Sequence, residues 1–264
     1  MNTKMNDTNN VQKQYKDGKN LSTRVSLYEK YSVNRKKYST WIFENYKFFD
    51  GCRILEFGSG FGKDWKDKVE ILSPKSTLIL SDFSPGMVEE LRSIFGEYSN
   101  VETKILDIQD AQINDSYSDI VIANSMLYHV PDINKALMEV SRVLKTNGIF
   151  YATTSGNKSV FEYLSRTLPI IEPDILLPSS ISFTLQNGRE YLEQVFSHVR
   201  ITKYKNTLEI EDTNDLLDFI YSVSSIEGLN ESHRMKLYDY YESKKNSKGF
   251  ISIDIEYGMF IAKK

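Results

Sequence analysis

Short apolar runs alternate with amphipathic segments through the middle of the chain. Each run ends in glycine or in polar residues, which is typical of strands buried on both faces of a sheet. The segments between them repeat their apolar residues at helical spacing. Strands alternating with helices predict a mostly parallel sheet covered on both faces, because parallel strands need crossover connections. The apolar runs are residues 52–58, 76–82, 101–107, 119–125 and 149–154, and the amphipathic segments are 63–72, 87–95 and 133–145.

The segments outside this α/β core predict a helical cap, a lid and a closing pair of strands. Beyond Ser155 the alternation stops, and amphipathic insertions are placed to cover the carboxyl ends of the strands, where specificity usually resides. We expect a doubly wound, mostly parallel seven-stranded sheet with an antiparallel final strand. The expected parts are a flexible tail at 1–20, a single domain at 21–264 with a helical cap at 21–49, the core at 51–155, helical insertions at 157–182 and 212–248, and the closing strands at 199–206 and 251–264.

Composition and charge narrow the class of protein. With 40% hydrophobic and 26% charged residues, the 264-residue chain is typical of a soluble globular protein. Cys52 is the single cysteine, which fits a reducing compartment. No stretch approaches the roughly 20 apolar residues of a membrane helix, and the first 20 residues carry no signal-peptide run. We therefore expect a cytoplasmic protein without a membrane partner, and a net charge of −3 gives no general attraction to nucleic acid.

A glycine-rich loop follows the first apolar run, with glycines at 58, 60 and 62. Glycine lets the backbone turn tightly and approach a ligand without a Cβ in the way. The spacing is G-x-G-x-G, whereas the dinucleotide-binding fingerprint is G-x-G-x-x-G. Taken alone, the loop also fits a structural tight turn.

Two carboxylates follow at the ends of the next two runs. Asp82 lies 20 residues after Gly62, where a carboxylate can accept hydrogen bonds from two ribose hydroxyls; an N-cap is the alternative. Asp107 is followed by Ile108, which would pair an acceptor for an adenine amino group with an apolar ring contact; a solvated loop is the alternative. Three such elements on three successive strands favour an adenosyl ligand.

The motifs ILEFGSGFG, LILSDFSPGMV, KILDIQD and DIVIANSMLYHVPDINKALMEVSRVLKTNGIFYATT resemble those of class I S-adenosylmethionine-dependent methyltransferases. The last block is similar to small-molecule methyltransferases of the ubiquinone-biosynthesis type, and the likeness covers residues 54–154. It implies that S-adenosylmethionine is the cofactor and S-adenosylhomocysteine the product. The cofactor residues that the resemblance implies are Glu56 toward the methionine amino group, Gly58, Ser59, Gly60 and Gly62 in the loop, Asp82 at the ribose, Phe83 and Met87 beside the adenine, Asp107 and Ile108 at the adenine edge, and Asn124 facing the methionyl group.

The methyl-transfer chemistry leaves fewer marks in the sequence, because the sulfonium is already activated and the protein need only align a nucleophile and exclude water. His129 is the candidate general base or substrate contact, with a structural role equally open. Among the N-terminal aromatics Tyr31 is our choice to close the sulfonium side, with ordinary helix packing as the alternative. Trp65 is interpreted as a core residue, and no cluster has metal-ligand spacing.

The sequence thus predicts methyl transfer to an oxygen, nitrogen or carbon of a small organic molecule by a monomer or homodimer. Methylation of tRNA or protein is the alternative within the same class, although the acidic balance favours no nucleic-acid partner. A non-catalytic adenosyl-binding module also stays open. The glycine spacing and the acids after two strands argue against an NAD-dependent oxidoreductase.

Overall fold

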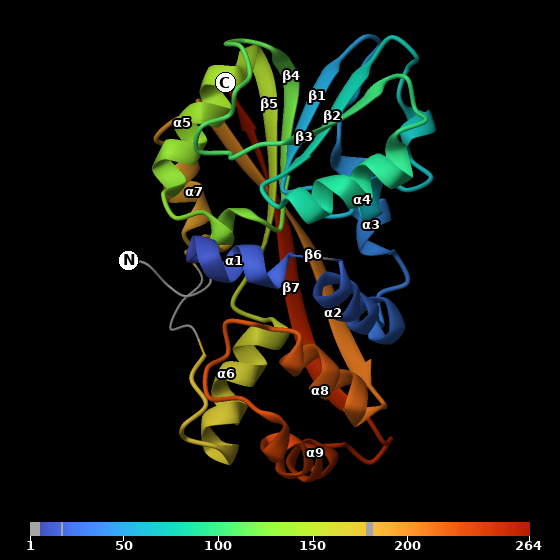
Figure 1. The fold of residues 1–264 in the computed structure, drawn as a ribbon, viewed down its shortest axis with the longest axis vertical. Helices are drawn as coiled ribbons and strands as arrows, with labels where there is room; N and C mark the ends of the chain where they lie inside the picture. Colours follow the sequence, from blue (N-terminus) through green and yellow to red (C-terminus); the bar gives the residue numbers. More distant parts are fainter. Residues whose placement is uncertain (1–5, 17, 178–181) are drawn as a thin grey trace.

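The strands form one mixed sheet in the computed structural model, which describes residues 6–16, 18–177 and 182–264 (Figure 1). Their order across the sheet is β3-β2-β1-β4-β5-β7-β6. Only β7 runs opposite to its neighbours, so the final strand of the chain is antiparallel as expected. The strands are β1 (Arg53–Phe57), β2 (Thr77–Asp82), β3 (Val101–Ile105), β4 (Ser118–Asn124), β5 (Leu144–Ser155), β6 (His198–Ile210) and β7 (Ile251–Lys263).

The parallel register brings the polar ends of the central strands together. In β1, Phe57 pairs with Ser81 of β2 on one side and with Ala123 of β4 on the other. The residues that follow these positions therefore meet at one edge of the sheet, where ligands bind in open α/β folds. The strands reach this edge through apolar side chains that are almost fully buried.

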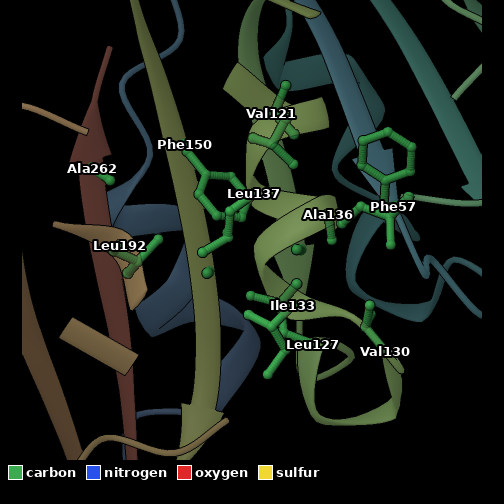
Figure 2. Packing of buried hydrophobic residues seen from close by; sticks show 14 of the residues in the cluster. Phe57, Val121, Leu127, Val130, Ile133, Ala136, Leu137, Phe150, Leu192 and Ala262 are labelled. Atoms are coloured by element: carbon green, nitrogen blue, oxygen red, sulfur yellow. The ribbon is translucent and has the colours of Figure 1, made fainter. Parts of the chain in front are cut away.

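Helices cover both faces of the sheet, and a further helical group lies beyond the strand ends (Figure 1). Helix α5 begins at an Asp132 N-cap, which accepts a hydrogen bond from the Lys135 amide at 3.0 Å. Its apolar face packs on β4 and β5, where Leu137 lies beside Phe150 in the first hydrophobic cluster (Figure 2). The helices are α1 (Thr8–Gln14), α2 (Lys19–Tyr31), α3 (Tyr38–Asn45), α4 (Pro85–Phe95), α5 (Ile133–Val143), α6 (Val160–Ile171), α7 (Gly188–Leu192), α8 (Thr213–Tyr221) and α9 (Arg234–Glu242).

The prediction of a helix at residues 63–72 is wrong. Two short 3-10 turns, η2 (Lys63–Trp65) and η3 (Val69–Ile71), take its place. Asp67 between them has a left-handed φ of 60°, which interrupts any continuous right-handed helix.

The helical insertions gather around the long ends of β6 and β7. These two strands extend past the other strands of the sheet, and α2, α6, α8 and α9 surround the part that extends (Figure 1). Apolar residues from all of them form a second buried cluster, which includes Leu164, Leu217 and Leu237. The expected helical insertions inside and before the antiparallel pair are therefore present, although residues 178–181 of the first lie outside the described residues.

Part of the segment expected as a flexible tail at 1–20 forms a helix, and we call the described residues between 6 and 18 the strap. Residues 1–5 and 17 lie outside the described residues, but residues 8–14 form α1, which Asp7 caps by accepting from the Asn10 amide. The strap is fixed to β2's end and α4, because Ser84 Oγ donates to the Tyr15 carbonyl and the Gly18 amide donates to Glu90. A polar sequence gives little sign of this, since tertiary contacts rather than propensity stabilise so short a helix. None of the helices in the described ranges has the length and apolar character needed to cross a membrane.

Candidate active site

The glycine loop turns sharply at the end of β1. Gly58, Gly60 and Gly62 have φ values of 66°, 56° and 73°, in the left-handed region that other residues rarely adopt. A Cβ at Gly58 would lie 2.7 Å from the Met126 side chain, so the loop also has no room for one there. Ser59 fastens the turn to β2 through its amide, which donates to the Ser81 carbonyl at 2.9 Å. The expected loop geometry is confirmed.

Glu56, at the end of β1, is a buried carboxyl group held by neutral donors. Trp65 Nε1 donates to one of its oxygens, and Asn124 Nδ2 donates to the other at 3.1 Å. Asn124 Nδ2 also donates to the Tyr46 hydroxyl at 2.8 Å. Burial raises the pKa of Glu56 to about 8, despite the opposing Trp65 hydrogen bond. A ligand ammonium beside this carboxylate would supply the missing positive charge, so the site fits the amino group of a methionyl ligand.

Asp82 ties the glycine loop to the end of β2. Its two oxygens accept the amides of Gly60 and Ser84, each at 2.9 Å. Burial raises the pKa of Asp82, and these backbone hydrogen bonds oppose that effect. A carboxylate has about four acceptor positions, so its remaining lone pairs suit a ribose diol. The turn then continues through half-buried Phe83 to fully buried Met87 in the first turn of α4.

Asp107 and Ile108 follow β3 as the sequence predicts. Asp107 Oδ1 accepts the Gln109 amide at 2.8 Å, so its carboxylate faces its own turn. Ile108 is 4% exposed and belongs to the first hydrophobic cluster. The pair lies at the strand end beside Asp82, because Asp82 pairs with Ile105 in the register of β2 and β3. Their contact with an adenine stays a prediction.

His129 lies in the 3-10 helix η4 (Leu127–His129), beyond β4, where the strap reaches it. Tyr15 Oη and His129 Nε2 are 2.8 Å apart, and the two rings meet edge to face. Leu21, just beyond the strap, lies over the glycine loop: a Cβ on Gly60 would be 2.9 Å from its side chain. The N-terminal segment therefore covers the strand ends on which the site is built.

Tyr31 does not join this site. Its hydroxyl donates to Asp215 Oδ2 at 2.6 Å and accepts the Asp212 amide, so it packs at the N-terminus of α8. Arg24, earlier on α2, instead reaches the Ser222 carbonyl at the other end of α8. The two helices thus run antiparallel, and the residues of α2 nearer its start face the strand ends.

Four tyrosines lie near the carboxyl ends of β4 and β5, beside the middle of β7, and form what we call the tyrosine cluster: Tyr28, Tyr38, Tyr128 and Tyr257. The Tyr257 ring lies 6.0 Å from Tyr28 and 5.3 Å from Tyr38. Ser125 nearby adopts a φ of 49°, a strained value for serine of the kind that clusters at functional sites. Sequence reasoning singled out none of these as a unit. The available signal was the helical i, i+4 spacing of Arg24 and Tyr28, which puts them on one face of α2.

Three comparisons place this architecture among known proteins. A family model described as a methyltransferase domain matches residues 48–211, more than half of the chain. Malonyl-[acyl-carrier protein] O-methyltransferase of Acetivibrio thermocellus is 27% identical over 231 residues, covering 82% of this chain and 78% of the relative.

Two solved structures share the fold. The YcgJ protein of Bacillus subtilis superposes with a TM-score of 0.61 at 17% identity, covering 86% of this chain and 97% of that one. A SAM-dependent methyltransferase of Aquifex aeolicus superposes with a TM-score of 0.55 at 13% identity, covering 93% of this chain and 97% of that one.

Across the described residues, no group of three or more His, Cys, Asp or Glu is arranged to hold a metal ion.

Proposed function

The chain belongs to the methyltransferase-domain family and is an S-adenosylmethionine-dependent methyltransferase, and from this premise we propose that its acceptor is a small organic molecule. The observation that carries the proposal is the N-terminal strap. Its contacts with Ser84, Glu90 and His129 place polypeptide over the strand ends. A covered site of this kind admits a small molecule more readily than a folded RNA.

When bound, S-adenosylmethionine supplies an electrophilic methyl group on its sulfonium, and S-adenosylhomocysteine is the product. We assign Glu56 and Asn124 to the methionyl end, Asp82 to the ribose and the turn at Asp107 to the adenine. The strap excludes water, which aids a displacement that needs alignment above all. His129 is proposed to accept a proton where the nucleophile carries one, with Tyr15 fixing its ring.

A second, narrower candidate is a malonyl thioester, whose carboxylate oxygen would be the nucleophile. It is favoured by the relative from Acetivibrio thermocellus, whose printed name is malonyl-[acyl-carrier protein] O-methyltransferase and which aligns with most of this chain. In that reaction the carboxylate oxygen bonds to the methyl group while the sulfonium becomes a neutral thioether. No proton is released, so His129 would not act as a base.

The acceptor class is tested by incubating the protein with methyl-labelled S-adenosylmethionine and a cell extract separated into small-molecule, RNA and protein fractions. We expect label in the small-molecule fraction, and malonyl-pantetheine serves as the defined probe of the second candidate. An Asp82→Ala variant is the control for label that does not depend on the site. Label confined to RNA, label on protein that cleavage of thioesters does not release, or label absent from every fraction would refute the proposal.

A further inference from the structure

Arg24 carries a positive charge into the covered site and is incompletely satisfied there. Its Nη1 donates to the Ser222 carbonyl at 2.9 Å, and its guanidinium carbon lies 5.3 Å from the centre of the Tyr15 ring. Its Nη2 is buried and has no hydrogen-bond partner among the residues that the structure describes. A buried donor without a partner destabilises the folded protein, and more so when it is charged. A residue that tolerates this cost is a candidate for binding a ligand.

Two tyrosines, Tyr28 and Tyr128, are close enough to Arg24 to feel its charge. Tyr28 lies one helical turn further along α2, and Arg24 acts electrostatically on both Tyr28 and Tyr128. Burial raises the pKa of Tyr28 to about 12, so this hydroxyl stays protonated at neutral pH. The Tyr38 hydroxyl is likewise buried, near the hydroxyls of Thr153 and Ser125. Arg24 and the tyrosine cluster together thus offer one cation and several neutral hydrogen-bond donors, a combination that suits an anion.

The shape of a guanidinium indicates which anion fits. Its planar fork presents paired N–H donors that match the two oxygens of a carboxylate. We propose that Arg24 binds a carboxylate of the methyl acceptor, assisted by hydroxyls of the tyrosine cluster, so that the acceptor is a small organic acid. The proposal rests on the small-molecule function proposed above and names the chemical class and the residue that selects it.

The other source of a carboxylate is the methionyl end of the cofactor. The partners of Arg24 favour the acceptor, because they are the Ser222 carbonyl at the end of α8, the Tyr15 ring beside His129 and, electrostatically, Tyr128 of η4. The buried acid that suits the methionyl ammonium is Glu56, on β1. Tyr257 pairs with Ser155 at the carboxyl end of β5, and β4 separates that end from the end of β1 where Glu56 lies.

The test measures binding to protein saturated with S-adenosylhomocysteine, so that it does not depend on turnover. Calorimetry compares malonyl-pantetheine, benzoate and 3-phenylpropionate with the amide of each acid. We expect at least one acid to bind at least about tenfold more tightly than its amide. Arg24→Gln should abolish that preference, since a charged hydrogen bond contributes about 1.5–3 kcal/mol, or roughly 10- to 150-fold.

Two further variants complete the design. Arg24→Lys keeps the charge and should retain part of the preference, which a purely structural role would not predict. Arg166→Gln removes an exposed arginine that pairs with Glu162 on α6, and it should leave binding unchanged. Equal binding of acid and amide, or absence of binding by every acid, would overturn the proposal.

The same variants identify the source of the carboxylate. S-adenosylhomocysteine has the carboxylate and 5′-methylthioadenosine lacks it. A loss of affinity in Arg24→Gln for the first compound but not for the second would assign Arg24 to the cofactor and overturn the proposal. If acids bind through Arg24 but receive no labelled methyl group, the proposed function fails while the carboxylate site stands.

Discussion

Replacing Glu56 by glutamine should remove a large pH dependence from the stability of the ligand-free protein. The side chain is 2% exposed, and burial raises its pKa from 4.5 to about 8. Between these values the folded protein holds a proton that the unfolded chain releases, so stability falls as pH rises through this window. From pH 5 to pH 7 the loss is about 2–3 kcal/mol, since each pKa unit is worth about 1.36 kcal/mol.

Glutamine is nearly isosteric and stays neutral, so it escapes this penalty. Urea unfolding of wild type and Glu56→Gln at pH 5, 6, 7 and 8 gives the difference in unfolding free energy, in which other titrating groups largely cancel. The variant should gain about 2–3 kcal/mol relative to wild type between pH 5 and pH 7. Glu89→Gln, at an exposed position on α4, is the matched control. Parallel pH profiles for wild type and Glu56→Gln would refute the reasoning.

Three further changes test neighbouring parts of the site. Asp82→Asn should weaken binding of S-adenosylhomocysteine by about tenfold or more while the far-UV spectrum is unchanged, because a charged acceptor for the ribose is lost; unaltered affinity by calorimetry would contradict the ribose assignment. Tyr15→Phe removes the hydroxyl beside His129 and should speed hydrogen exchange in residues 8–15, read by mass spectrometry; equal exchange rates would show that this contact does not hold the strap. Trp65→Phe deletes a donor to Glu56 and should extend the pH-dependent loss of stability above pH 8, whereas a profile matching wild type would rule out that role.

The parts of the site that the sequence predicted are those fixed by local geometry. Parallel strands place their carboxyl ends together, so Asp82 and Asp107 could be assigned to one edge from their positions at the ends of apolar runs, whereas Glu56 and Asn124 were assigned through the resemblance. The glycine spacing predicted a tight turn, and the structure shows that the glycines make it with left-handed φ values. For these aspartates and glycines, the residue type and its place relative to a strand were sufficient to predict the position in the fold.

The parts that the sequence did not predict depend on how separate segments dock. Tyr31 and Arg24 lie seven residues apart on α2 and share a face, so periodicity alone could not choose between them. A helix rises about 1.5 Å per residue, which separates the two by about 10 Å along the axis. Docking against α8 puts Tyr31 at Asp215 and leaves Arg24 near the strand ends. The strap is a similar case, since its order comes from contacts with α4 and His129.

Glu56 and Arg24 have a common physical meaning that no sequence pattern displays. Each is an ionisable group whose hydrogen-bond and ring partners in the described part of the chain are neutral: those of the buried Glu56 are an indole and an amide, and those of the half-buried Arg24 are a carbonyl and a ring. An acid in this state suits a cation, and a guanidinium in this state suits an anion. Glu56 lies near the end of β1 and Arg24 lies on α2, so the free-energy cost of holding each group without an opposite charge would be offset by a different ligand. This separation favours a cofactor ammonium at Glu56 and an acceptor carboxylate at Arg24, with the methyl group transferred between them.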